Sequence, residues 1–160
     1  MGKKKDAIHN EHDKGYKNLL THKKTFIELL RSFVHEEWVN EIDEANIVYV
    51  NKSYILQDFE EKEADIVYKV RIRDKDVIFY CLLELQSTVD FQMPVRLLYY
   101  MCEIWRDILK NTRNKERKRK DFRLPAVIPL VLFNGANKWT VCKNFKEILD
   151  GYELFKDHIL

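Results

Sequence analysis

A carboxylate and an amide, Glu84 and Gln86, follow the most apolar segment of the chain. The preceding residues, 77–83, are all apolar and predict a strand buried on both faces. Alternate side chains of a strand share a face, so Glu84 and Gln86 should project together, about 6.6 Å apart along the backbone. A second carboxylate, Asp65, starts the preceding predicted strand. Because an unpaired charge is costly to bury, these oxygens are candidate ligands of a divalent cation.

Such a site would suit phosphodiester hydrolysis. Two carboxylates can hold Mg²⁺ and leave coordination positions for a water molecule and a phosphate oxygen. The bound metal lowers the pKa of that water and stabilises the charge that develops on the phosphorane. Spacing alone leaves another interpretation open, in which Asp65 only starts a strand and Glu84 forms an ordinary salt bridge.

The patterning before these residues predicts the elements that position them. A first helix is expected from about Lys14 to His35, with Asp13 as its cap. Its apolar stripe should consist of Leu19, Phe26, Leu30 and Phe33. The polar stretch 36–44 then separates this helix from the strands.

Three strand-like segments follow the first helix. Residues 47–50 and 53–56 have the composition of a strand or strand edge, with no clear break between them, so they count once in the order of strands. Residues 65–72 alternate in the pattern of a half-buried strand. Residues 73–76, with the sequence RDKD, predict a turn. The strands that carry Asp65 and Glu84 should therefore be hairpin partners in one sheet.

A second helix should begin near Pro94, a residue suited to a first helical turn, and end at about Lys110. Helical spacing places Arg96, Tyr100 and Glu103 on a side apart from the core stripe. That stripe is expected to contain Leu97 or Leu98, Met101, Trp105, and Ile108 or Leu109.

The last part of the chain completes the predicted sheet. Residues 126–133 predict a buried strand, in which Pro129 favours an edge position or a bulge. A short helix is expected near residues 144–149. The order of one helix, three strands, one helix and one strand favours an α/β fold with a mixed sheet and helices packed on it.

Composition limits the class of protein. With 160 residues and 46% hydrophobic content, the chain can bury one core, so we expect a flexible N-terminus over residues 1–11 and a single domain over 12–160. A net charge of +2 favours no partner. Three distant cysteines in apolar contexts predict buried free thiols. No apolar stretch has the length of a membrane span, and we predict a cytoplasmic protein.

Several runs of residues resemble the recombination-promoting nucleases, a family also called putative transposases, within the PD-(D/E)XK nuclease superfamily. The similarity covers about residues 12–150 in the family's order. It implies a three-layer α-β-α restriction-endonuclease-like core with αβββαβ order, and cleavage of DNA with Mg²⁺, or alternatively Mn²⁺. It also implies that the chain is the N-terminal part of a longer protein. The matching runs are 12–17 (HDKGYK), 65–70 (DIVYKV), 83–87 (LELQS), 93–100 (MPVRLLYY) and 128–135 (IPLVLFNG).

The resemblance assigns roles to the candidate residues by position. Asp65 and Glu84 would be metal ligands, and Gln86 stands where the wider superfamily usually has lysine. Glutamine can orient a water molecule by hydrogen bonds but cannot neutralise charge, a role in which another cation could compensate. Arg96 and Lys69 are the candidates for that role.

Other residues have both a functional and a simpler interpretation. Glu28 could be the first-helix acid that often completes such sites, or part of a solvated helix face. Arg96 and Tyr100 could contact the DNA backbone, or only pin their helix to the sheet. The basic run 113–123 holds seven basic and two acidic residues. Its candidate phosphate contacts are Arg117, Lys118, Arg119 and Lys120, unless the run is simply solvated.

The function expected from the sequence is a Mg²⁺-dependent DNA endonuclease associated with recombination or transposition. DNA is the expected partner, and a second copy of the chain is another candidate, as a homodimer. The alternative is a non-catalytic DNA-binding or interaction module that retains the nuclease fold. A purely structural domain of a mobile-element protein is a third interpretation.

Overall fold

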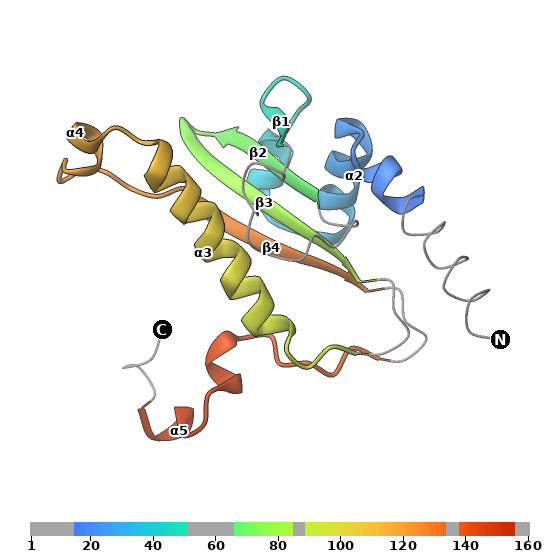
Figure 1. The fold of residues 1–160 in the computed structure, drawn as a ribbon. Helices are drawn as coiled ribbons and strands as arrows, with labels where there is room; N and C mark the ends of the chain where they lie inside the picture. The colour runs from blue at the N-terminus through green and yellow to red at the C-terminus, as the bar shows by residue number, and fades with distance from the viewer. Residues whose placement is uncertain (1–14, 51–65, 85–88, 134–137, 156–160) are drawn as a thin grey trace, which may run out of the picture.

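In the computed structural model, the described residues 15–50, 66–84, 89–133 and 138–155 form a mixed sheet with helices on both faces (Figure 1). The sheet has the order β1-β2-β3-β4, antiparallel except for the parallel pair β3–β4. Its strands are β1 (Ile47–Val50), β2 (Ile66–Ile72), β3 (Lys75–Glu84) and β4 (Ala126–Phe133). The labelled helices are α2 (Lys23–Phe33), η1 (Glu37–Glu41), α3 (Met93–Asn111), α4 (Asn114–Arg117), η3 (Phe145–Ile148) and α5 (Tyr152–Phe155).

Strands β2 and β3 form the predicted hairpin, with a tighter turn than expected. The last pair of its ladder is Ile72 opposite Lys75, so only Arg73 and Asp74 form the turn. Both have positive φ, 48° and 63°, as a two-residue hairpin turn that matches strand twist requires. An ion pair between Arg73 and Glu41 of η1 holds the turn against the preceding segment.

Strand β4 lies at one edge of the sheet that the described residues form. Pro129, opposite Tyr80 of β3, has no backbone N–H to donate to a ladder. A proline is compatible with this strand because an edge strand needs partners on one side only. The edge position predicted from Pro129 is confirmed.

Two hydrophobic cores cover the two faces of the sheet, so the predicted three-layer arrangement is confirmed. Phe79 and Cys81 of β3 belong to the core on the α2 side, whereas Ile78 and Tyr80 belong to the core on the α3 side. On the α2 side, Phe26 stacks on Tyr68 with ring centroids 4.3 Å apart. Strand β2 was expected to be half-buried, yet Val67 is buried on the α3 side.

The continuous first helix predicted over 14–35 is wrong. Residues 15–20 and α2 are separate helices, with a break at Thr21 and His22. The Thr21 hydroxyl donates to the Asn18 carbonyl at 2.7 Å, a local bond that competes with helix continuation. The break releases the Leu20 carbonyl, which accepts a hydrogen bond from the Tyr68 hydroxyl at 2.9 Å.

The predicted apolar stripe of this region is only partly right. Phe26 and Leu30 are fully buried, and Leu20 and Ile27 join them in the core. Leu19 and Phe33 are 55% and 74% exposed instead. The break changes the helical phase, so spacing counted along one continuous helix cannot place both ends correctly.

Helix α3 begins at Met93 with Pro94 in its first turn, as predicted, but its buried face is rotated from the expected one. Tyr100 and Ile104 are buried at the centre of the helix. The predicted stripe flanks them as partly buried residues packed on the same core. These flanking residues are Leu97, Met101, Trp105 and Ile108.

The remaining expectations have mixed outcomes. The short helix near 144–149 is present as η3. Of the three free cysteines, Cys81 is buried, Cys142 is half-buried and Cys102 is exposed, so burial of all three is wrong. The segments 1–11 and 53–56 lie outside the described residues. Within the described part of the chain, no helix has the length and apolar character to cross a membrane.

The bond between Tyr68 and Leu20 gives a stability prediction. Burial raises the pKa of Tyr68 from 10.0 to about 12, with Tyr49 contributing. We expect Tyr68→Phe to lower the free energy of unfolding at pH 7 by about 1–2 kcal/mol, because the buried Leu20 carbonyl loses its donor. Urea denaturation measures this loss. A matched Tyr49→Phe variant, which removes a hydroxyl with no hydrogen bond among the described residues, should change stability little.

The contribution of Tyr68 to stability should depend on pH. Because the pKa of Tyr68 is higher in the folded state, its contribution is fully present below pH 10 and is lost as the pH rises toward about 12. The wild type should therefore lose more stability than Tyr68→Phe between pH 9 and about 11. Parallel curves for the two proteins would contradict this assignment.

Candidate functional site

The backbone of the predicted site lies where β3 ends. Glu84 is the last residue of β3 and pairs with Phe133, the last residue of the parallel strand β4. Strand β2 begins beside the same part of β3, since Ile66 pairs with Cys81. Asp65, Gln86 and the side chain of Glu84 lie outside the described part of the structure. Their roles as metal ligands and catalytic groups therefore stay predictions.

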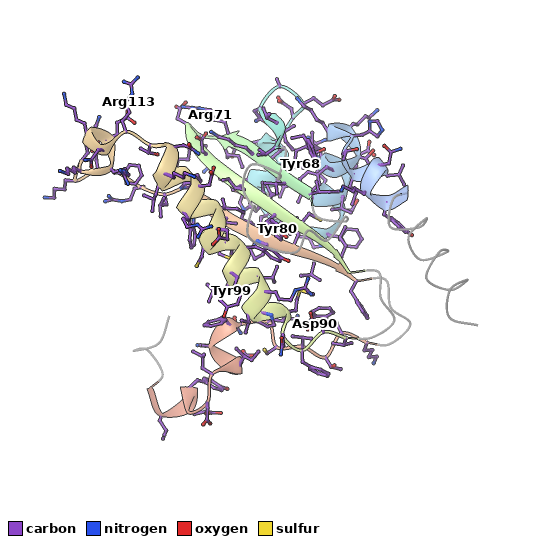
Figure 2. All side chains as sticks on the ribbon, in the orientation of Figure 1. Tyr68, Arg71, Tyr80, Asp90, Tyr99 and Arg113 are labelled. Carbon is purple, nitrogen blue, oxygen red and sulfur yellow. The ribbon has the colours of Figure 1, made fainter. Side chains whose placement is uncertain are left out.

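A polar cluster at the start of α3 is described in full. The Arg96 guanidinium donates to the Asp90 carboxylate at 2.5 Å, and both side chains are largely buried, at 20% and 30% exposed. Asp90 also accepts the backbone N–H of Gln92 at 2.9 Å, which shapes the chain just before the helix (Figure 2). One turn along α3, Tyr100 stacks on Tyr80 of β3 with ring centroids 4.9 Å apart. The cluster thus joins α3 to the central strand.

Arg96 stays positively charged although its side chain is largely buried. Burial lowers the pKa of the Arg96 guanidinium, but hydrogen bonds with Asp90 and Tyr100 outweigh burial and raise it above its ordinary value. The expectation that Arg96 and Tyr100 lie apart from the core is wrong, since Tyr100 is only 5% exposed. Their assignment to DNA binding stays a prediction, and the burial of Tyr100 favours the simpler role of pinning α3 to the sheet.

Lys69 and Arg96 were the two cations proposed to replace the missing lysine. Lys69 lies opposite Ile78, toward the start of β3, and its ammonium forms an ion pair with Asp76 at 2.7 Å. Arg96 lies instead in the cluster built on Tyr80, nearer the end of β3. Arg96 thus lies nearer the end of β3 than Lys69 does, and the compensating role of either cation stays a prediction.

Glu28 lies on the exposed side of α2, while Phe26, Ile27 and Leu30 fill the opposite side. Its backbone carbonyl accepts a hydrogen bond from the Ser32 hydroxyl at 2.8 Å. Nothing in the described structure joins its carboxylate to another acidic group. The catalytic role of Glu28 stays a prediction, and its position agrees with a solvated helix face.

The basic run 113–123 is exposed and lies far from the end of β3. It comprises α4 and the turn after it, and leads into Ala126, which pairs with Val77 near the start of β3. Arg119 donates two hydrogen bonds to Asp121, at 2.9 and 2.6 Å, and these hold the pKa of Asp121 below its ordinary value. Arg117, Lys118 and Lys120 are exposed without such a partner among the described residues. Phosphate contact by these four residues stays a prediction.

Within the described residues, no three His, Cys, Asp or Glu side chains gather as a metal site. Asp90 is the polar residue that sequence reasoning missed. An Asp two residues before the N-cap of a proline-started helix is a recognisable signal of a local turn. Its pairing with an arginine six residues later requires the chain to reverse between them, which periodicity does not reveal.

The layers and strand order define an α/β protein with the architecture of a restriction-endonuclease-like core. The chain belongs to a family described as "Putative transposase, YhgA-like", whose model matches residues 10–160. The family recognised from the sequence motifs is thus confirmed.

One curated relative is the "Recombination-promoting nuclease RpnD" of Escherichia coli O157:H7. It is 22% identical over 134 residues, which cover 82% of this chain and 49% of the relative. The chain therefore spans about half the length of the curated relative that it matches. No solved structure matches the chain significantly.

The pair of Asp90 and Arg96 gives a second prediction. Asp90→Asn keeps the side-chain oxygen for Gln92 but removes the charge beside the largely buried Arg96. We expect the free energy of unfolding to fall by about 1–2 kcal/mol, since charge-assisted hydrogen bonds are stronger than neutral ones. Chemical denaturation measures the free energy of unfolding of Asp90→Asn and of a control, Asp121→Asn. The control breaks an arginine pair that is exposed to solvent, so it should change stability little. Equal losses would show that burial does not strengthen the first pair.

Proposed function

We propose that this chain is a metal-dependent DNA nuclease domain, an endonuclease associated with recombination or transposition. The family match over residues 10–160 carries the proposal. A relative named as a recombination-promoting nuclease and the αβββαβ core support it. The site would lie at the end of β3, between the start of β2 and the end of β4.

The donor set suits the proposed metal. Asp65 and Glu84 offer carboxylate oxygens and Gln86 an amide oxygen, which are hard ligands of the kind that Mg²⁺ and Mn²⁺ take. Asp65 and Glu84 would hold the ion. The described residues near them offer no thiol or imidazole cluster that would favour a softer metal. When bound, the ion would supply Lewis-acid activation of water and of the phosphate.

Two other residues of the chain would orient the water and stabilise the charge on the phosphate. Gln86 would orient the attacking water by hydrogen bonds, since an amide can both donate and accept. Arg96 would supply positive charge near the end of β3, while its bond to Asp90 fixes the position of the guanidinium. A preorganised cation stabilises charge growing on the phosphate without reorganisation during the reaction.

The first functional prediction concerns the metal ligands. Glu84→Gln and Asp65→Asn should each reduce Mg²⁺-dependent nicking of supercoiled plasmid by about 10²-fold or more, because a neutral amide holds the ion weakly. The measurement is the rate of conversion to open circular DNA. Glu44→Gln, an exposed carboxylate before β1, serves as the matched control and should nick at the wild-type rate. Undiminished nicking by both ligand variants would refute the assignment.

Gln86 has a separate test. Gln86→Ala should slow nicking by about 10-fold or more, because the water loses a positioning group. Gln86→Lys should restore or exceed the wild-type rate, since lysine also contributes charge. Measured rates that are equal for all three proteins would remove Gln86 from the mechanism while leaving the metal ligands untouched.

A second candidate function is a DNA-binding module that retains the nuclease fold without catalysis. Two observations favour it, namely Gln86 in place of lysine and the engagement of Arg96 by Asp90. Calorimetric titration with Mn²⁺ separates the two functions. Metal binding that disappears in Glu84→Gln favours the nuclease, whereas DNA binding without any Glu84-dependent metal binding favours the module.

A further inference from the structure

The basic charge of this protein is concentrated at one exposed point. We call residues 113–123 the basic tip; they carry seven basic and two acidic side chains, a net charge of +5. The whole chain has a net charge of only +2, so all other residues together carry −3. In Figure 1 the tip, with α4, lies beyond the end of α3 and away from the sheet. Arg123, the last residue of the tip, lines a pocket with Asp74, Asp76 and Asp107, whereas α4 lies apart from the sheet.

Hydrogen bonds fix the backbone of the tip. The Trp105 indole of α3 donates to the Pro125 carbonyl at 2.9 Å, which fixes the return of the chain toward β4. Within the tip, Arg119 is paired with Asp121, and Arg123 donates to the carbonyls of Lys120 and Phe122 at 2.9 and 2.8 Å. These two arginines are used to hold the turn.

Five other cations of the tip have no ion-pair or hydrogen-bond partner for their side chains in the described part of the chain, and all are exposed. They are Arg113, Lys115, Arg117, Lys118 and Lys120. Figure 2 labels Arg113, which lies between the end of α3 and α4. Glu116 is the one acidic side chain among them, so the free surface is strongly positive.

We propose that the basic tip binds the phosphate backbone of double-stranded nucleic acid, as an anchor remote from the end of β3. The exposed side chains of the tip include no apolar or aromatic group, and its one aromatic residue, Phe122, is half-buried. Protein interfaces and membrane surfaces are usually anchored by such side chains, and single-stranded nucleic acid by aromatic stacking. Ammonium and guanidinium groups alone match a regular array of phosphates.

The position of the tip sets the size of the substrate. Strands β3 and β4 are parallel, so α3 carries the chain from the end of β3 back to its start. With 19 residues, α3 is about 28 Å long. The tip and the first residue of α3 are therefore separated by about 28 Å along the helix axis. This length is equivalent to about eight base pairs of duplex at 3.4 Å each. This reach rests on the proposed nuclease function, which places the cleaved phosphate near the end of β3.

The test measures binding by fluorescence anisotropy in EDTA, with duplex DNA of 8 and 24 base pairs. The wild type should bind the 24-base-pair duplex about 10-fold or more tightly than the 8-base-pair one, because an 8-base-pair duplex is no longer than the separation itself and cannot cover the contact surfaces at both ends. Replacing Lys115, Arg117, Lys118 and Lys120 with Gln should abolish this preference. It should also reduce the slope of log affinity against log salt by about 1 for each phosphate that these side chains neutralise in the wild type.

A matched pair of double variants controls for total charge. Lys118→Gln/Lys120→Gln removes two positive charges from the tip. Lys17→Gln/Lys24→Gln removes two positive charges elsewhere, one from the helical residues 15–20 and one from α2. Only the tip pair should weaken duplex binding. Equal affinities of the two double variants would overturn the proposal, as would tip-dependent binding to vesicles with anionic lipid in place of duplex binding.

The outcomes for the anchor and the nuclease are distinguishable, because the binding assay contains no metal and needs no cleavage. Loss of duplex binding in the tip variant supports the anchor even if the wild type never nicks plasmid. Nicking of plasmid by the wild type, combined with unchanged duplex binding by the tip variant, supports the nuclease and overturns the anchor.

Discussion

The burial of β3 on both faces is the constraint on which the rest of this structure depends. Phe79 and Cys81 complete the core against α2, and Ile78 and Tyr80 complete the core against α3. A strand buried on both faces must be covered by helices on each side and paired along both edges. Both conditions are met, by β2 on one edge and β4 on the other. The proposed metal site lies at the end of this central strand, where neighbouring elements converge.

The parallel pairing of β3 with β4 has a second consequence. A parallel connection must return the chain to the start of the first strand, and α3 does so. Its first turns therefore lie beside the end of β3, with Asp90, Arg96 and the stacked Tyr100, and its last turn leads to the basic tip. One helix thus separates Arg96, which is 20% exposed and paired with Asp90, from tip cations that are exposed and lack a side-chain partner among the described residues. The chemistry of the two ends differs because their burial differs.

The differences between expectation and structure have local physical causes. Arg96 and Tyr100 were assigned to an outer face because apolar residues occur around most of α3, so helical spacing allowed more than one buried face. The stacking of Tyr100 on Tyr80 selects one of them. The first helix is interrupted at Thr21, and the Leu20 carbonyl bonds to Tyr68, 48 residues away in the chain. No pattern within the helix itself indicates that partner.

The sequence by itself determined the order of elements, the β2–β3 hairpin and the family, and it limited β4 to an edge position or a bulge, because each depends on local patterns of apolar, turn and motif residues. It also identified Asp65, Glu84 and Gln86 as the groups to test. Only the tertiary structure decided which face of α3 is buried, that Asp90 holds Arg96, and that the basic tip lies at the far end of α3 from the proposed site. These features depend on contacts between segments distant in the chain, which are set by packing and chain direction rather than by local spacing.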